Sequence, residues 1–210
     1  MNITPEQYDA IAAKVASIEG ITVGIGSEHA ACTIAAINLA LSGKLTDEIP
    51  DCMSLAIGNA AIPLQDAMPA ELRNSQRYRN LIPLMAGTGR DPETEKRRSA
   101  VILDWMWNIV LPQLQPFADT RGFGDEWRRM CRGRSRDTTY AACAVTYAAY
   151  AAYYLVADAA YNAAKYGCSA STYAATTAAY ANATYYDATG KETFWNAVDP
   201  VGVLERMVAA

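Results

Sequence analysis

The chain has 210 residues, 51% of them apolar, and a formal net charge of −4 at pH 7. This composition is typical of a folded protein with a sizeable core, and it argues against a disordered chain and against a protein that coats nucleic acid. The sequence has neither a long apolar run nor a signal-peptide pattern, so we expect no membrane segment and a cytoplasmic location.

The first predicted helix has a clear beginning and end. Thr4, Pro5 and Gln7 match a capping box with proline at the first helical position, and Gly20 ends the apolar stripe that follows. The next segment, Ile21–Gly26, contains two glycines and is short, which favours a connector over a strand.

Two further helices are predicted from caps and apolar content. Ser27 is expected to cap a helix that runs from Glu28 to about Ser42. A third helix is expected over roughly residues 52–66, with a kink at Pro63.

The strongest helix start is Asp91-Pro92-Glu93, where a cap, a proline and first-turn acids coincide. Its apolar pattern predicts a helix through Leu111 that Pro112 and Pro116 bend or end. At the end of the chain, two short helices over 191–198 and 200–208 are expected to be anchored by four large side chains: Phe194, Trp195, Leu204 and Met207.

The stretch Thr138–Tyr186 consists mostly of alanine and tyrosine, and its only formal charges from Tyr140 onward are Asp158 and Lys165. Tyrosines recur at intervals of seven residues, a spacing typical of helices that lie side by side: Tyr140, Tyr147, Tyr154, Tyr161 and, after Gly167, Tyr173 and Tyr180. We therefore predict two long antiparallel helices joined near Gly167.

Two interpretations of these tyrosines remain open. Because a ring-rich, uncharged surface is unfavourable in water, Tyr154, Tyr161, Tyr173 and Tyr180 are predicted to form a homo-oligomer interface. Alternatively, some of the rings could stack on a planar ligand.

Arginines are concentrated just before this stretch: Arg121, Arg128, Arg129, Arg132, Arg134 and Arg136. Guanidinium groups bind phosphates and carboxylates, so a site for a small anionic ligand is predicted from Arg128, Arg129, Arg132, Tyr140 and Tyr147. The alternative is a solvated basic segment that pairs with the acids of the chain.

Metal and catalytic patterns are weak. His29 and Cys32 would share one face of the second helix, but a full ligand set is missing and the five cysteines lack paired spacing. Gly87–Pro92 resembles a phosphate-binding turn without its lysine, so a turn with a helix cap is favoured. We predict no metal, no cofactor and no catalytic residues, and lean against an enzyme.

Several short blocks occur in an order that resembles a group of uncharacterised bacterial and phage-encoded proteins: Cys32, Thr46-Asp47, IPDCMS (Ile49–Ser54), QDAMP (Gln65–Pro69), LIPLMAGT (Leu81–Thr88) and RRSAVILDW (Arg97–Trp105). The group has a cysteine-bearing helical body and an alanine-rich helical tail, and this chain departs from it by carrying tyrosine in the tail. The resemblance implies a helical fold and a link to phages or mobile elements, and it implies no catalytic residue.

Together these features predict an all-α protein with a helical body (1–136) and an Ala/Tyr helical hairpin with closing helices (137–210), folding as one cooperative unit. Two functions remain open. One is a non-catalytic binding protein that captures a small anionic or nucleotide-like ligand or blocks a host protein, and the other is a self-assembling structural protein that forms an oligomer or filament.

Overall fold

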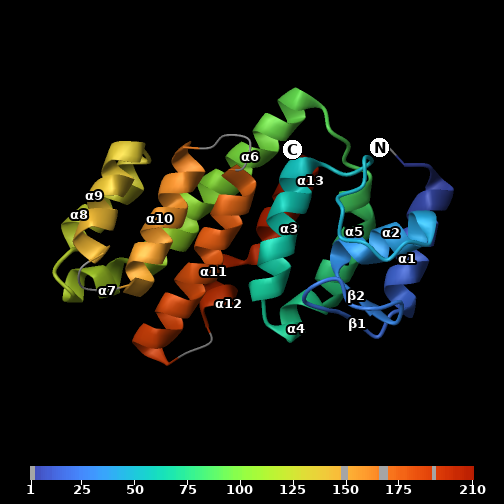
Figure 1. Ribbon diagram of the computed structural model, residues 1–210, viewed down its shortest axis with the longest axis horizontal. Helices are drawn as coiled ribbons and strands as arrows, with labels where there is room; N and C mark the ends of the chain where they lie inside the picture. Colours follow the sequence, from blue (N-terminus) through green and yellow to red (C-terminus); the bar gives the residue numbers. More distant parts are fainter. Residues whose placement is uncertain (1–2, 148–150, 166–169, 191–192) are drawn as a thin grey trace. The chain divides into compact units, whose positions relative to one another are not determined.

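The computed structural model describes residues 3–147, 151–165, 170–190 and 193–210, without the side chains of 136, 145–147, 151–154, 164–165 and 187–188 (Figure 1). The regular secondary structure of the described chain is helical apart from two short parallel strands, β1 (Gly20–Ile21) and β2 (Ala30–Ala31), so the predicted all-α class is confirmed. The chain forms two compact units, Met1–Arg98 with Val201–Ala210, and Ser99–Pro200. The predicted grouping into 1–136 and 137–210 as one cooperative unit stays a prediction.

In the first unit, α1 (Pro5–Ser17) packs against α2 (Thr33–Ser42) and α5 (Gln76–Ala86). The predicted capping box is present: the Thr4 hydroxyl accepts the Gln7 N–H at 3.2 Å, and the Gln7 side chain accepts the Thr4 N–H at 2.9 Å. The core of this unit is made of large apolar side chains, among them Ile11, Ile34, Ile37, Met53, Ile57, Leu64 and Tyr78.

The predicted helix from Glu28 is wrong at its beginning, because α2 starts at Thr33 with Cys32 as its cap. Residues Ala30 and Ala31 pair instead with Gly20 and Ile21. The chain reaches this pairing through Gly26 at φ 81°, where a Cβ atom would lie 2.2 Å from the Ala30 carbonyl oxygen. Backbone pairing and a glycine turn therefore replace the first turns of the predicted helix.

The third predicted helix, α3 (Leu55–Ala67), is confirmed with a later start. Ser54 is its cap, since the Ser54 hydroxyl accepts the Ile57 N–H at 3.2 Å. Helix α3 leads to the short α4 (Ala70–Arg73) and then to α5.

Helix α6 (Pro92–Trp105) begins as predicted, with the Asp91 carboxylate accepting the Thr94 N–H at 2.9 Å. Its predicted continuation to Leu111 is not α-helical, because a π-helical turn (Met106–Val110) and a 3-10 turn (Leu111–Leu114) follow. Pro112 has no N–H to donate and its ring crowds the preceding turn, which accounts for the change in winding. Two short helices come next, α7 (Gln115–Thr120) and α8 (Gly124–Gly133).

The Ala/Tyr stretch forms three helices: α9 (Arg136–Tyr147), α10 (Ala151–Lys165) and α11 (Ala170–Thr189). Helices α10 and α11 pack side by side in opposite directions, which confirms the predicted hairpin, and its joint near Gly167 lies outside the described residues (Figure 1). The first predicted long helix is instead divided, and α9 packs beside both α8 and α10. This arrangement buries Ala142 and Cys143 of α9, which one continuous helix would leave beyond the end of α11.

The contact between α10 and α11 is made of small side chains. Most of the buried residues described on these helices are alanines: Ala157, Ala159, Ala160 and Ala163 on α10, and Ala170, Ala174, Ala175, Ala178 and Ala181 on α11. The buried hydroxyls of Thr177 and Thr184 donate to carbonyls one turn earlier at 2.7 and 2.9 Å. Alanine thus allows a close approach of the helix axes, as the composition predicts.

The chain closes with α12 (Phe194–Val198) and α13 (Pro200–Ala209). The four predicted anchors are confirmed, since the side chains of Phe194, Trp195, Leu204 and Met207 are all buried.

Candidate anion-binding site

Helix α8 presents the predicted arginines because its two faces differ. Trp127 and Met130 are fully buried, and the Trp127 indole N–H donates to the Leu111 carbonyl at 3.1 Å. This anchoring turns the intervening arginines toward solvent. The helix ends at Gly133, where the next residue, Arg134, adopts a left-handed conformation with φ 47°.

The structure brings Arg128, Arg129 and Arg132 together around one shallow pocket of about 250 Å³, with Asp125 as the fourth lining residue. Arg128 lies 3.0 Å from the Asp119 carboxylate and 3.5 Å from that of Asp125. Three cations and one carboxylate therefore face this pocket.

The remaining arginine pairs show which cations are compensated. Arg129 lies 2.6 Å from the Glu126 carboxylate, and Arg134 lies 3.6 Å from that of Asp104. Arg132 is exposed and makes no ion pair with any residue that the structure describes. Some arginines of the cluster thus pair with acids, and Arg132 has no ion pair with a described residue, so the two interpretations of the cluster both stay predictions.

Of the two predicted aromatic residues of the site, Tyr140 is not part of this pocket. Tyr140 lies on α9, with 69% of its surface exposed, and it is not among the pocket-lining residues. The side chain of Tyr147 lies outside the described residues, as does that of Tyr154 from the predicted interface. Of the other predicted interface residues, Tyr161 and Tyr173 are half-buried and Tyr180 is 39% exposed.

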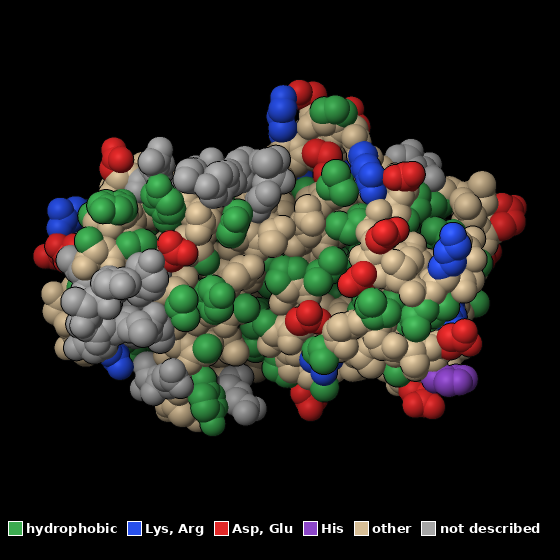
Figure 2. Space-filling model, viewed as in Figure 1, with side chains coloured by type: hydrophobic (Ala, Val, Ile, Leu, Met, Phe, Trp, Pro, Cys, Tyr) green, Lys and Arg blue, Asp and Glu red, His purple; other side chains and the backbone are tan. Residues whose placement is uncertain are grey.

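Figure 2 shows part of the surface over α10 and α11, where apolar side chains predominate and charged ones are few among the coloured atoms. The exposed large side chains of these helices include Leu155, Tyr180 and Tyr186. This agrees with a sequence in which Asp158 and Lys165 are the only formal charges from Tyr140 to Tyr186. The second copy predicted to cover these rings stays a prediction.

The four cysteines that the structure describes are poor nucleophiles. Burial raises the pKa of Cys32 and Cys52, and it raises the pKa of Cys131 to about 12 and that of Cys143 to about 11. These four thiols are therefore protonated near neutral pH, and a thiolate is the form that attacks substrates or binds metals. Cys168 lies outside the described residues.

The predicted placement of His29 and Cys32 on one helix face is wrong. His29 is exposed and precedes β2, whereas Cys32 caps α2 with its sulfur accepting the Ala35 N–H at 3.3 Å. Within the part of the chain that the structure describes, no three histidine, cysteine or acidic side chains are grouped closely enough to hold a metal ion.

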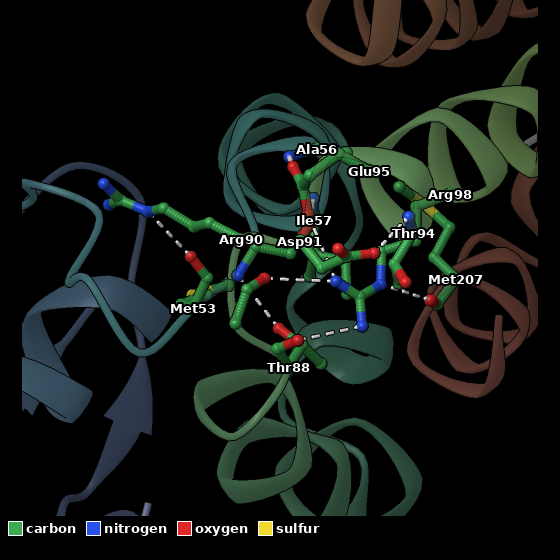
Figure 3. A network of polar contacts seen from close by, with 12 residues as sticks. Met53, Ala56, Ile57, Thr88, Arg90, Asp91, Thr94, Glu95, Arg98 and Met207 are labelled. Carbon is green, nitrogen blue, oxygen red and sulfur yellow. Dashed lines mark hydrogen bonds and ion pairs between the residues drawn. The ribbon is translucent and has the colours of Figure 1, made fainter. Parts of the chain in front are cut away.

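Carbonyl groups of the turn at Gly87–Pro92 already accept hydrogen bonds from a side chain of the protein itself, as Figure 3 shows. The buried Arg98 guanidinium donates to the carbonyls of Thr88 and Gly89 at 3.0 and 3.1 Å. It also lies 3.1 Å from the Glu95 carboxylate and donates to the Met207 carbonyl at 3.2 Å. The turn thus serves as a helix start and a structural junction.

Glu95 completes this junction at the beginning of α3. Its second carboxylate oxygen accepts the Ala56 N–H at 2.8 Å, and the Thr88 hydroxyl accepts the Ser54 N–H at 2.9 Å. Two donors at the beginning of α3, the N–H groups of Ser54 and Ala56, are therefore satisfied from the segment 88–95, which sequence reasoning treated as a separate helix start.

Sequence reasoning also missed a cleft of about 620 Å³ between α1 and α5. It is lined by both polar and apolar side chains: Tyr8, Ala12, Val15, Ala16, Asn74, Gln76, Arg79, Asn80, Pro83 and Leu84. Its volume lies within the range of small-molecule sites. No sequence motif links residues 8–16 with residues 76–84. The only available signal was the helical periodicity that places the lining residues of each segment on one face of its helix.

No helix in the described ranges has both the length and the apolar composition needed to cross a bilayer. Comparison of the chain with protein-family models, with curated proteins and with solved structures finds no match.

Proposed function

We propose that this protein is a non-catalytic binding protein that captures a small anionic, nucleotide-like ligand at α8. The observation that carries this proposal is the pocket lined by Arg128, Arg129 and Arg132, in which Arg132 has no carboxylate partner among the described residues. A phosphate group placed there would receive charge-assisted hydrogen bonds from several guanidinium donors.

The existing ion pairs oppose such a ligand only weakly. The side chains of Arg128 and Asp119 are 38% and 45% exposed, and that of Arg129 is 68% exposed. Exposed pairs of this kind contribute about 0–1 kcal/mol each, because water screens both charges. A ligand with two or more negative charges can therefore displace the carboxylates.

Two observations favour binding over catalysis. The described thiols are held in the protonated form by burial, and the single histidine is exposed on a segment outside the arginine pocket. The resemblance to phage-encoded proteins suggests a context, in which the captured ligand is a signal or the bound partner is a host protein. The cytoplasm is the proposed location.

The test is calorimetric titration of the intact protein with ADP and, separately, with inorganic pyrophosphate. Reversing the charges with Arg128→Glu and Arg129→Glu should weaken binding at least tenfold, because repulsion replaces two charge-assisted contacts. Arg132→Ala should weaken it several-fold without breaking an ion pair seen in the structure. Helical circular dichroism should not change in either variant.

A matched control is Lys44→Glu with Lys96→Glu, which changes the net charge equally at residues of the first unit, whereas α8 belongs to the second. An equal loss of affinity in this control would mean that ADP binding depends on the net charge of the protein and not on the arginines of α8. Unchanged affinity in the α8 variants, or no binding of either probe by the parent protein, would rule out the site.

Self-assembly is the second candidate function, and the exposed Leu155, Tyr180 and Tyr186 favour it. A rim of rings on helices with few charges is typical of a surface that associates with another copy. Native mass spectrometry should then show an oligomer that Tyr180→Lys with Leu155→Lys dissociates. A monomer at micromolar concentration in the parent protein would contradict this candidate.

A further inference from the structure

The cleft between α1 and α5 continues into an apolar hollow. This second hollow, of about 550 Å³, shares Tyr8 and Leu84 with the cleft and is otherwise lined by Ile3, Pro5 and Asp9. The two spaces therefore adjoin at Tyr8 and Leu84. The cleft is lined by amide and guanidinium groups, and the adjoining hollow is lined mainly by apolar side chains.

Arg79 gives the polar end an uncompensated positive charge. Its guanidinium donates to the carbonyls of Val15 at 2.7 Å, Ile18 at 3.4 Å and Glu19 at 3.3 Å, all of which are neutral acceptors. It has no ion pair with any described residue, and the residues that line the cleft of about 620 Å³ include no acid. This charge stands out in a chain whose net charge is −4.

Several donors near Arg79 have no acceptor. The Arg79 Nε–H, the Tyr8 hydroxyl and the Asn80 side-chain N–H make no hydrogen bond with the part of the chain that is described. Asn80 instead uses its amide oxygen, which accepts from Gln76 at 2.7 Å. One cation and surrounding donors, in a cleft whose lining residues include no acid, suit a group that carries a single negative charge and accepts hydrogen bonds.

We infer that this cleft binds an amphiphilic monoanion, a carboxylate whose head lies at Arg79 and Asn80 and whose alkyl chain crosses Leu84 toward Ile3 and Pro5. The single cation matches a carboxylate better than a phosphate, which would bring nearly two charges. Asp9 borders the apolar hollow and repels a second anionic group there, so the far end of the ligand is neutral. Burial of the alkyl chain against Leu84, which is 39% exposed, supplies the hydrophobic contribution.

The experiment titrates the full chain with octanoate, and with acetate and 1-octanol as probes of the head and the tail alone. Octanoate should bind at least tenfold more tightly than either, because only it fills both ends of the site. In ¹H–¹⁵N spectra, the side-chain amide signals of Gln76 and Asn80 should shift with octanoate. Equal binding of acetate would indicate an anion site without a tail, and equal binding of 1-octanol a hydrophobic site without a head.

Two variants locate the ligand without disturbing the contacts of Arg79. Leu84→Glu should weaken octanoate binding at least tenfold, since it puts a carboxylate where the alkyl chain crosses. Tyr8→Phe should weaken it about fivefold, the value expected for one net hydrogen bond of about 1 kcal/mol. The matched control is Leu45→Glu at a leucine that is 40% exposed elsewhere, and it should leave binding unchanged.

This inference is independent of the arginine pocket on α8. The double variant Arg128→Glu with Arg129→Glu should therefore keep octanoate binding while it loses ADP binding. If octanoate fails to bind at millimolar concentration, or if Leu84→Glu binds it as the parent does, the cleft is not an amphiphile site.

Discussion

In the first unit, the Arg98 guanidinium is buried among three carbonyls and the Glu95 carboxylate, whereas in the second unit α10 and α11 meet through alanine methyl groups. Both contacts exclude water, yet they depend on different properties of their side chains. The Arg98 junction needs every partner present, because a buried charge without partners is costly. The alanine contact needs every side chain to stay small, because close helix axes leave no room for more atoms. The Arg98 junction is therefore sensitive to the removal of side-chain atoms, and the alanine contact is sensitive to their addition.

The largest expected effect comes from removing the Arg98 charge. Arg98→Met should lower the free energy of unfolding by about 3–5 kcal/mol, because Glu95 and the carbonyls of Thr88, Gly89 and Met207 lose their donor. Urea unfolding followed by circular dichroism measures this loss.

The control for that prediction is the neighbouring Arg97→Met. Arg97 is exposed and donates to the Ala210 carbonyl and the Thr94 hydroxyl, so its loss should change the free energy of unfolding by no more than about 0.5 kcal/mol. Equal losses in the two variants would contradict the view that the junction depends on the buried charge.

A smaller effect is expected from enlarging the alanine contact. Ala178→Leu should lower the free energy of unfolding by about 1–3 kcal/mol, because Ala178 is fully buried and added methylenes force the helices apart. Ala183→Leu on the exposed side of α11 should stay within about 0.5 kcal/mol of the parent, as measured by urea unfolding. Stabilisation by Ala178→Leu would show that the contact has unfilled space.

The smallest expected effect concerns the reactivity of one buried thiol in each unit. At pH 8, Cys143 with its pKa of about 11 should react with iodoacetamide more than tenfold slower in the native protein than in urea, because the thiolate is scarce. Cys32 in the first unit, buried and with a raised pKa, should also be protected. Peptide mass spectrometry after timed alkylation gives both rates.

We expect Cys143 to react faster than Cys32. The alanine contacts near α9 bury little apolar area per residue, so local opening should be easier there than around the larger core side chains at α2. Faster reaction of Cys32 would reverse this order and show that the first unit opens more readily.

The sequence by itself determined the features that depend on local chemistry. The capping box at Thr4, the start of α6 at Asp91 and the helicity of the alanine-rich stretch follow from hydrogen bonds and propensities within a few residues. The short spacing of Arg128, Arg129 and Arg132 in the sequence likewise keeps them close together on α8.

Only the tertiary structure decided the features that depend on distant partners. The pairing of Ala30 and Ala31 with β1 shortened α2, and the packing of α9 against α8 and α10 divided a stretch whose composition favours one helix. Glu95 and Arg98 became a junction because Thr88, Ala56 and Met207 lie beside them, and the cleft at Arg79 exists because α5 packs on α1. Local propensities amount to tenths of a kcal/mol per residue, so burial and distant hydrogen bonds override them wherever the two conflict.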